Sequence, residues 1–168
     1  MRPDPSRVVP FAQAYIALVN ETELRAAFIN HTAALNEMLD SIPPGKYDYA
    51  YAPGKWTIKE VVPHLIDAER IFIYRAVCFA RKDPGPFPSF DENAYADNSK
   101  AGRRSWDVLV EELRLVRGSS KLLYDSFDEE QLESGGISSN HPSYVRGIGY
   151  ILLGHATHHM NLIKERYL

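Results

Sequence analysis

The chain has 168 residues, of which 45% are hydrophobic and 24% are charged, and its formal net charge is −3. This length and composition are ordinary for a globular protein, so we predict a single domain, residues 1–168, with a core of its own. No more than two basic residues stand side by side, and no stretch approaches the roughly 20 apolar residues of a membrane span. Neither nucleic acid nor a membrane is therefore an expected partner.

The single cysteine, Cys78, excludes a disulfide framework within the chain and favours a reducing compartment. Near the N-terminus, the apolar run "VVPFAQAYIALV" is interrupted by Pro10 and Gln13, so we expect no signal peptide. These features predict a cytoplasmic protein.

The first predicted helix covers residues 20–40. Asn20 and Glu23 have the spacing of a helix cap followed by a glutamate, and "IPPG" follows the last turn. Side chains then recur at alternating spacings of four and three residues, which is typical of a helix face turned towards a core. These residues are Leu24, Phe28, His31, Leu35 and Met38.

The second predicted helix covers residues 58–82. Thr57 and Glu60 form a capping box in "GKWTIKE", so the helix begins at Ile58. Pro63 lies inside this helix and removes one backbone donor, so we expect a kink immediately before His64.

A segment rich in Pro, Asp and Asn, residues 83–104, follows the second helix and is too long for a tight turn. Its aromatic residues Phe87, Phe90 and Tyr95 either cover the mouth of a pocket or belong to a packed connection without chemistry. The third predicted helix covers residues 105–127. Its expected core residues are Val108, Leu109, Leu113, Val116 and Leu123.

The fourth predicted helix covers residues 143–166, with Lys164 and Arg166 suited to its C-terminal dipole. No alternating strand pattern of useful length is present. The sequence therefore predicts an all-α four-helix bundle. Because the 83–104 connection permits a crossover, we expect an up-down-down-up order in which the second and third helices are parallel.

Histidines fall at one level of this bundle. His64 lies seven residues after Thr57, about 10 Å into its helix at 1.5 Å per residue. His159 and His155 lie seven and eleven residues before Arg166, about 10 to 16 Å from the end of the antiparallel fourth helix. His31 reaches the same level from the first helix, nine residues before its end.

Three neutral imidazoles would hold one divalent metal ion and leave a coordination position open, as in catalytic sites. His155 and His159 point the same way because they are four residues apart, and His64 faces inward between Val61 and Leu65. The pair His155 and His158, three residues apart, is the alternative. Histidines at this spacing are also common as packing or surface residues without a metal.

Other polar residues have two interpretations each. Asp67 either orients the free ring nitrogen of His64 or faces solvent and Arg70. His158 is a neighbour of the ligands or a dimer contact, and His31 lines the pocket or is a satisfied core histidine. We expect Glu69 to pair with Arg75 or Arg146, and His141 to lie in a loop.

The stretches "GKWTIKEVVPHLIDAER", "FDENAY" and "GHATHH" resemble the DinB-like family, and more closely its branch described as metal-dependent hydrolases. The resemblance covers almost the whole chain and departs from the family pattern at Pro63. It implies an up-down-down-up bundle, a homodimer, and a metal site with ligands His64, His155 and His159. It also implies that the ion is Zn²⁺, Ni²⁺ or another divalent metal, with Zn²⁺ and Ni²⁺ the expected ones.

Three functions follow from this reading. The first is a hydrolase in which a metal-bound water attacks a small molecule. The second is an S-transferase that uses the ion to activate a low-molecular-weight thiol, which would need no protein base. The third is a non-catalytic dimer that binds metal or another ligand.

Overall fold

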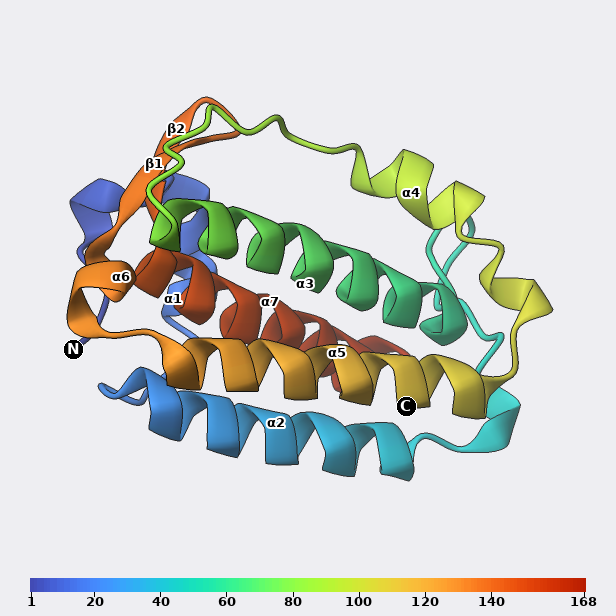
Figure 1. Cartoon of the computed structure of the whole chain (residues 1–168). Coiled ribbons are helices and arrows are strands. Elements are labelled where there is room, and N and C mark those ends of the chain that lie inside the picture. Colours follow the sequence, from blue (N-terminus) through green and yellow to red (C-terminus); the bar gives the residue numbers. More distant parts are fainter.

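The computed structural model describes residues 1–168 as a bundle of four long helices. These are α2 (Leu24–Ser41), α3 (Ile58–Ala80), α5 (Trp106–Ser126) and α7 (Val145–Arg166). Helices α2 and α7 run in one direction and α3 and α5 in the other (Figure 1). This arrangement confirms the predicted bundle and its up-down-down-up order.

Shorter elements connect and flank the bundle. The N-terminal segment contains three short helices, one short helix lies between α2 and α3, the crossover between α3 and α5 contains two, and a helix and a β-hairpin precede α7. They are η1 (Pro5–Arg7), η2 (Pro10–Ala12), α1 (Gln13–Ile16), η3 (Pro44–Lys46), α4 (Glu92–Asn98), η4 (Ala101–Arg103), α6 (Glu129–Glu133), β1 (Gly135–Ser138) and β2 (His141–Tyr144).

The start of α3 was predicted correctly. The Thr57 side chain accepts from the Glu60 backbone N–H and the Glu60 carboxylate accepts from that of Thr57, which is a complete capping box. Pro63 is buried inside α3, and the helix is continuous through it from Ile58 to Ala80. His64 therefore lies within α3, one residue after Pro63.

The predicted start of α2 at Asn20 was wrong, because the helix begins at Leu24 and has no side-chain cap. The backbone before it is engaged elsewhere. Tyr150 Oη donates to the carbonyl oxygens of Glu21 and Thr22, at 3.1 and 2.8 Å. These bonds hold the entry to α2 in an irregular conformation against α7.

The β-hairpin was not predicted, and it moves the start of α7 from Ser143 to Val145. Strands β1 and β2 pair antiparallel with Gly135 opposite Tyr144. The two turn residues, Ser139 and Asn140, have φ values of 52° and 63°, as a type I′ hairpin turn requires. Each strand has only four residues, too few for a recognisable alternation.

The buried face of α5 also differs in part from the prediction. Val108 is 50% exposed, whereas Leu109 and Leu113 are fully buried. The same face continues towards the C-terminus with Arg117 and Tyr124, both buried. A buried arginine on the core face carries no hydrophobic signal, so apolar periodicity placed the centre of this face incorrectly.

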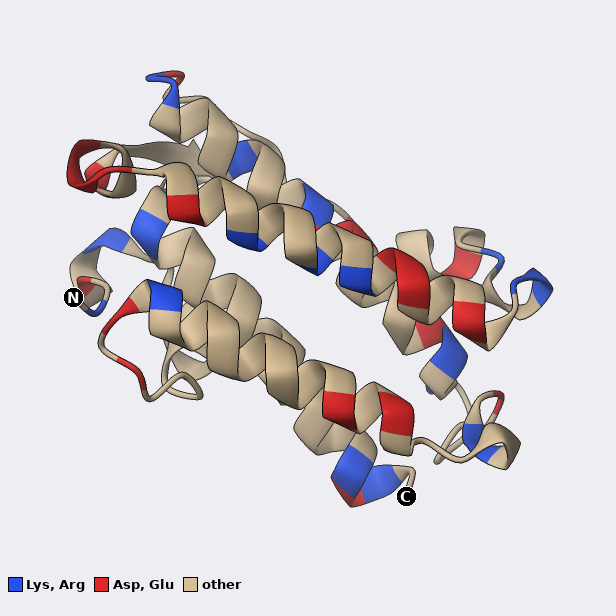
Figure 2. Cartoon of the chain, turned by 60° about the horizontal axis from the view of Figure 1, so that its bottom comes forward, with Lys and Arg blue, Asp and Glu red and all other residues tan.

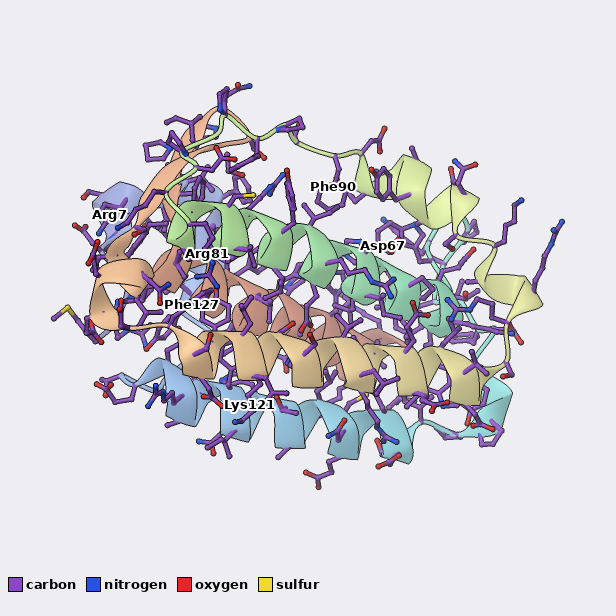
Figure 3. All side chains as sticks on the ribbon, in the orientation of Figure 1. Arg7, Asp67, Arg81, Phe90, Lys121 and Phe127 are labelled. Atoms are coloured by element: carbon purple, nitrogen blue, oxygen red, sulfur yellow. The ribbon has the colours of Figure 1, made fainter.

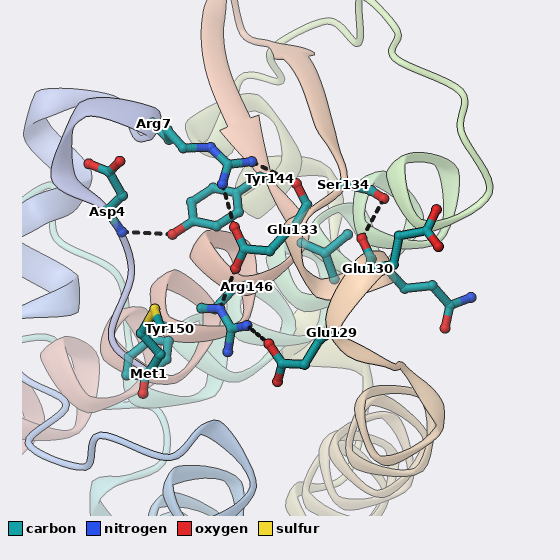
Figure 4. Close-up of polar contacts among 12 residues, drawn as sticks. Met1, Asp4, Arg7, Glu129, Glu130, Glu133, Ser134, Tyr144, Arg146 and Tyr150 are labelled. Carbon is teal, nitrogen blue, oxygen red and sulfur yellow. Dashed lines mark hydrogen bonds and ion pairs between the residues drawn. The ribbon is translucent and has the colours of Figure 1, made fainter.

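The N-terminal segment is fixed to the hairpin end of the bundle by ion pairs (Figure 4). Glu133 accepts from Arg7 at 2.5 Å and from Arg146 at 2.8 Å, and Arg146 also donates to Glu129 at 2.5 Å. The Arg7 guanidinium lies 3.8 Å from the centre of the Tyr144 ring. Together these contacts join residues near the N-terminus, α6, β2 and α7.

Each long helix carries charged residues of both signs. Figure 2 shows Lys, Arg, Asp and Glu interspersed along the ribbon, without a continuous basic face in this view. None of the helices combines the length and the apolar character that crossing a membrane requires.

Candidate metal centre

Helices α3 and α7 bring three predicted ligands together. His64 Nε2 lies 3.0 Å from His155 Nε2, and His159 Nε2 lies 3.2 Å from the same atom. One ligand atom from each of the three histidines lies within 4.8 Å of the others. Packing of α7 antiparallel to α3 places them at one level, as the helix lengths predicted.

The Nε2–Nε2 spacings of 3.0 and 3.2 Å suit a shared ion. With metal–nitrogen bonds of about 2.0–2.1 Å, ligand nitrogens lie about 3.3 Å apart in a tetrahedral site and about 2.9 Å apart at right angles. Hydrogen bonding alone explains the cluster less well. His155 Nε2 has either one N–H or one lone pair and cannot serve both neighbouring ring nitrogens.

Burial keeps the three imidazoles in the form that binds metals. It lowers the pKa of His64 to about 4, and the Glu92 carboxylate offsets part of this effect. Burial also lowers the pKa of His159 to about 3, with contributions from His64 and His158. The pKa of His155 falls well below its usual value, mainly through burial and then through His159 and His64. All three rings are therefore neutral at pH 7, with lone pairs available.

Aromatic rings surround the histidine cluster. The Trp56 ring lies 4.8 Å from His64, while Tyr15 and Phe72 present their edges to His155 at 5.4 and 5.9 Å between ring centres. Sequence reasoning missed Tyr15, which comes from α1. The sequence feature that could have indicated this contact is Gly154, a glycine inside a helix. In the structure, a Cβ at this position would lie only 1.9 Å from the Tyr15 carbonyl oxygen.

The histidines open into a cavity of about 510 Å³. Its walls come from α3, α7, the N-terminal segment, the loop before α3, the crossover and the hairpin, while α2 and α5 contribute no lining residue. The principal lining residues are Phe11, Tyr15, Trp56, His64, Phe72, Arg75, Phe90, Glu92, Ser139, His141, Ile148, Ile151, His155, His158 and His159. The lining combines 10 hydrophobic residues among 23 with histidines, serines, Arg75 and Glu92, so apolar surface and polar groups meet in one cavity, as in small-molecule sites.

Glu92, at the start of α4, is the one carboxylate that lines this cavity. Its charge acts on His64 and also contributes, after burial, to the raised pKa of Tyr15. The residue is exposed and was not identified from the sequence, because it lies in a segment without helical periodicity.

Two predicted pocket residues lie elsewhere. His31 Nδ1 contacts Thr157 Oγ1 at 2.8 Å and its Nε2 contacts Glu21 at 3.3 Å, so it is a satisfied histidine between α2 and α7. Asp67 is half-buried on α3 outside the cavity (Figure 3). Its pKa is raised, mainly by burial, while the nearby charge of Arg70 offsets part of this effect, which favours the interpretation in which Asp67 faces solvent or Arg70 rather than His64.

His158 lines the cavity but remains exposed. Its ring packs against Tyr15 at 5.5 Å and against His159 at 5.2 Å between centres. It therefore lies at the rim beside the cluster. His141, expected in a loop, belongs to β2 and also lines the cavity.

The predicted partner of Glu69 was wrong. Its carboxylate accepts two hydrogen bonds from Arg117 Nε and one from Arg117 Nη2, at 2.8 to 3.1 Å. Both side chains are almost completely buried. Helix α5 packs on α3 here, and hydrophobic periodicity does not reveal this polar pairing.

The crossover aromatics have separate roles. Phe90 lines the cavity and lies above α3 in Figure 3, and exposed Tyr95 packs against it at 5.3 Å between ring centres. Phe87 is buried in the core. The crossover thus covers the cavity through Phe90 and also packs against the bundle.

Comparisons with known proteins agree with this fold. YfiT from Bacillus subtilis, described as a probable metal-dependent hydrolase with an unusual four-helix bundle topology, aligns with a TM-score of 0.72 and 18% sequence identity. The alignment covers 98% of this chain and 90% of that chain, and it shows a common fold. No protein of curated function matches the sequence. The family model of the DinB superfamily matches residues 27–163, a range that contains all three clustered histidines, and the chain belongs to the DinB superfamily.

Proposed function

We propose that His64, His155 and His159 hold one divalent metal ion and that the protein hydrolyses a small molecule in the adjoining cavity. The observation that carries this proposal is the convergence of three neutral imidazole nitrogens at an open cavity of about 510 Å³. Zn²⁺ and Ni²⁺ are the expected ions, since both accept imidazole ligands.

A divalent ion in such a site polarises a substrate carbonyl and makes water more acidic. The chain supplies the remaining functions. Trp56, Tyr15 and Phe72 shield the three imidazoles, which strengthens electrostatic interactions there. Glu92 faces the same cavity and is the group placed to accept a proton from the attacking water.

Thiol S-transfer is the second candidate. The cavity volume favours it as well, because about 510 Å³ accommodates a small thiol and its acceptor together. A thiol is much more acidic than water, so this reaction does not require Glu92. Loss of activity on Glu92→Gln therefore distinguishes hydrolysis from S-transfer.

The proposal is tested by elemental analysis of the purified protein after reconstitution with Zn²⁺ or Ni²⁺, followed by hydrolase and thiol-transfer assays. We expect about one ion per chain, absent in His64→Ala and retained in His141→Ala, which changes a cavity histidine outside the cluster. Metal binding without turnover in either assay would support the non-catalytic alternative. Equal metal content in wild type and His64→Ala would contradict the assigned site.

We also propose that the protein is a homodimer. On α5, Val108, Leu115 and Leu122 are 50%, 68% and 71% exposed and recur every seven residues, which forms an apolar stripe outside the bundle. Light scattering of the wild type and of a Leu115→Lys, Leu122→Lys double variant tests this. We expect a dimer mass in the first and a monomer mass in the second.

A further inference from the structure

Arg75 is a buried cation with few partners. Its side chain leaves α3 and lines the cavity, and the residue is only 7% exposed. Nη2 donates to the Pro88 carbonyl oxygen at 2.5 Å and contacts Ser139 Oγ at 3.4 Å. Nε and Nη1 make no hydrogen bond to the protein, so two donor groups remain free on the cavity side.

The other buried arginines differ from Arg75 in one respect. Arg117 is paired with Glu69, and Arg146 is paired with Glu129 and Glu133. No carboxylate lies within ion-pair distance of Arg75, although Glu92 lines the same cavity. A buried charge without a counter-ion is costly, and a guanidinium cannot lose its proton at neutral pH.

The position of Arg75 relates it to the metal centre. His64, Ala68, Phe72 and Arg75 all line the cavity from one face of α3, at helical spacings of four, four and three residues. The eleven residues from His64 to Arg75 correspond to about 16 Å along the helix axis. Apolar wall lies between these ends, from Phe72 on α3 and from Ile148 and Ile151 on α7.

We propose that Arg75 binds a carboxylate group of the substrate, at the end of the cavity opposite the histidines. The substrate class is then an elongated small molecule with an apolar middle, an anionic group at one end and the reactive group at the other. The identification of the reactive end depends on the proposed function, whereas the anion site does not. Ser139, already in contact with Arg75, offers a hydroxyl beside the same group.

Matched ligand pairs test the anion site directly. The probes are 3-phenylpropionate, 4-phenylbutyrate and 5-phenylvalerate, each compared with its neutral amide by titration calorimetry on the full-length chain. Titrations use metal-free protein, so that a carboxylate cannot gain affinity by binding an ion, and are then repeated with Zn²⁺. We expect at least one carboxylate to bind metal-free wild type about tenfold or more tightly than its amide.

Two substitutions assign that preference to a residue. Arg75→Gln should remove most of the difference between carboxylate and amide, while Arg75→Lys should retain part of it because the charge remains. Arg70→Gln is the matched control, since Arg70 is on the same helix but outside the cavity, and it should leave the preference unchanged. Far-UV circular dichroism establishes that each variant is folded.

The absence of a carboxylate preference in the wild type across all three pairs would overturn the inference. So would a preference that persists in folded Arg75→Gln. These outcomes are independent of the metal proposal. If no metal binds, the preference in the metal-free protein still stands, and if no anion binds, the metal content of the histidine cluster is unaffected.

Discussion

Gly154 of α7 packs directly against the backbone of Tyr15, so closely that a Cβ at position 154 would meet the Tyr15 carbonyl oxygen at 1.9 Å and its carbonyl carbon at 2.4 Å. Backbone atoms cannot rotate away as a flexible side chain can. The contact therefore sets how near α1 approaches the histidine cluster, and it fixes the Tyr15 ring against His155.

Gly154→Ala should displace α1 and lower the free energy of unfolding by about 1–3 kcal/mol. Gly118→Ala is the control, because Gly118 is an exposed glycine of α5 with no atom within 4 Å of an added Cβ. That change should instead stabilise the protein by about 0.5–1 kcal/mol. Urea unfolding followed by circular dichroism measures both, and equal effects would show that the Gly154 contact is not tight.

His158→Ala should retain the metal, because the His158 ring lies at the exposed rim and does not join the three clustered nitrogens. The affinity of the variant for the metal ion should differ from that of wild type by less than about tenfold, as expected for the loss of a neighbouring group rather than a ligand. Competition with a chelating dye measures it, with His159→Ala as the comparison. Loss of metal in His158→Ala alone would favour the His155–His158 pair.

Glu92→Gln should reduce hydrolysis by about 10²-fold or more while the metal content stays constant, since the amide cannot accept the proton. Asp97→Asn provides the control, because Asp97 is an exposed carboxylate of the same helix outside the cavity. Rates of wild type and of both variants are compared at one pH and at saturating metal. An unchanged rate in Glu92→Gln would exclude Glu92 as the base.

The metal-free protein should lose stability as the pH falls. Burial lowers the pKa of folded His64 to about 4, whereas an unfolded histidine has a pKa of about 6.5. Below pH 6.5 the unfolded chain binds protons that the folded chain does not. The free energy of unfolding then falls, by up to about 1.4 kcal/mol per pH unit for each such histidine, until the folded pKa is reached.

Urea unfolding at several pH values between 7.5 and 5 measures this slope. His64→Gln removes one titrating group and should give a shallower slope, while His141→Gln, which changes an exposed histidine, should not. Identical slopes in wild type and His64→Gln would show that folding does not lower the pKa of His64.

Local sequence signals predicted the bundle because the long helices show apolar periodicity or capping residues. The Thr57–Glu60 capping box fixed the start of α3, and the spacing of His64, His155 and His159 along antiparallel helices was enough to bring them to one level. The hydrophobic stripe failed where the core contains charge, at Arg117 and Glu69, because burial of a paired ion leaves no apolar pattern.

Residues supplied by irregular segments were beyond sequence reasoning. Tyr15 and Glu92 reach the cavity through packing of the N-terminal segment and the crossover. Those contacts join residues far apart in the chain. The position of His31 shows the complementary limit: its depth along the helix was predicted, but depth does not tell which side of α7 a side chain faces.

The cavity wall is joined across the chain by backbone hydrogen bonds between the crossover and the hairpin. Ile137 N–H donates to Pro84 and Phe87 N–H donates to Ile137, while Ser139 N–H donates to Phe87, all at 2.9 to 3.0 Å. Such bonds do not depend on side-chain identity. The wall residues can therefore be exchanged while the strand-like pairing and the histidine-bearing helices stay in place, so the shape of the cavity can be altered separately from the histidine cluster.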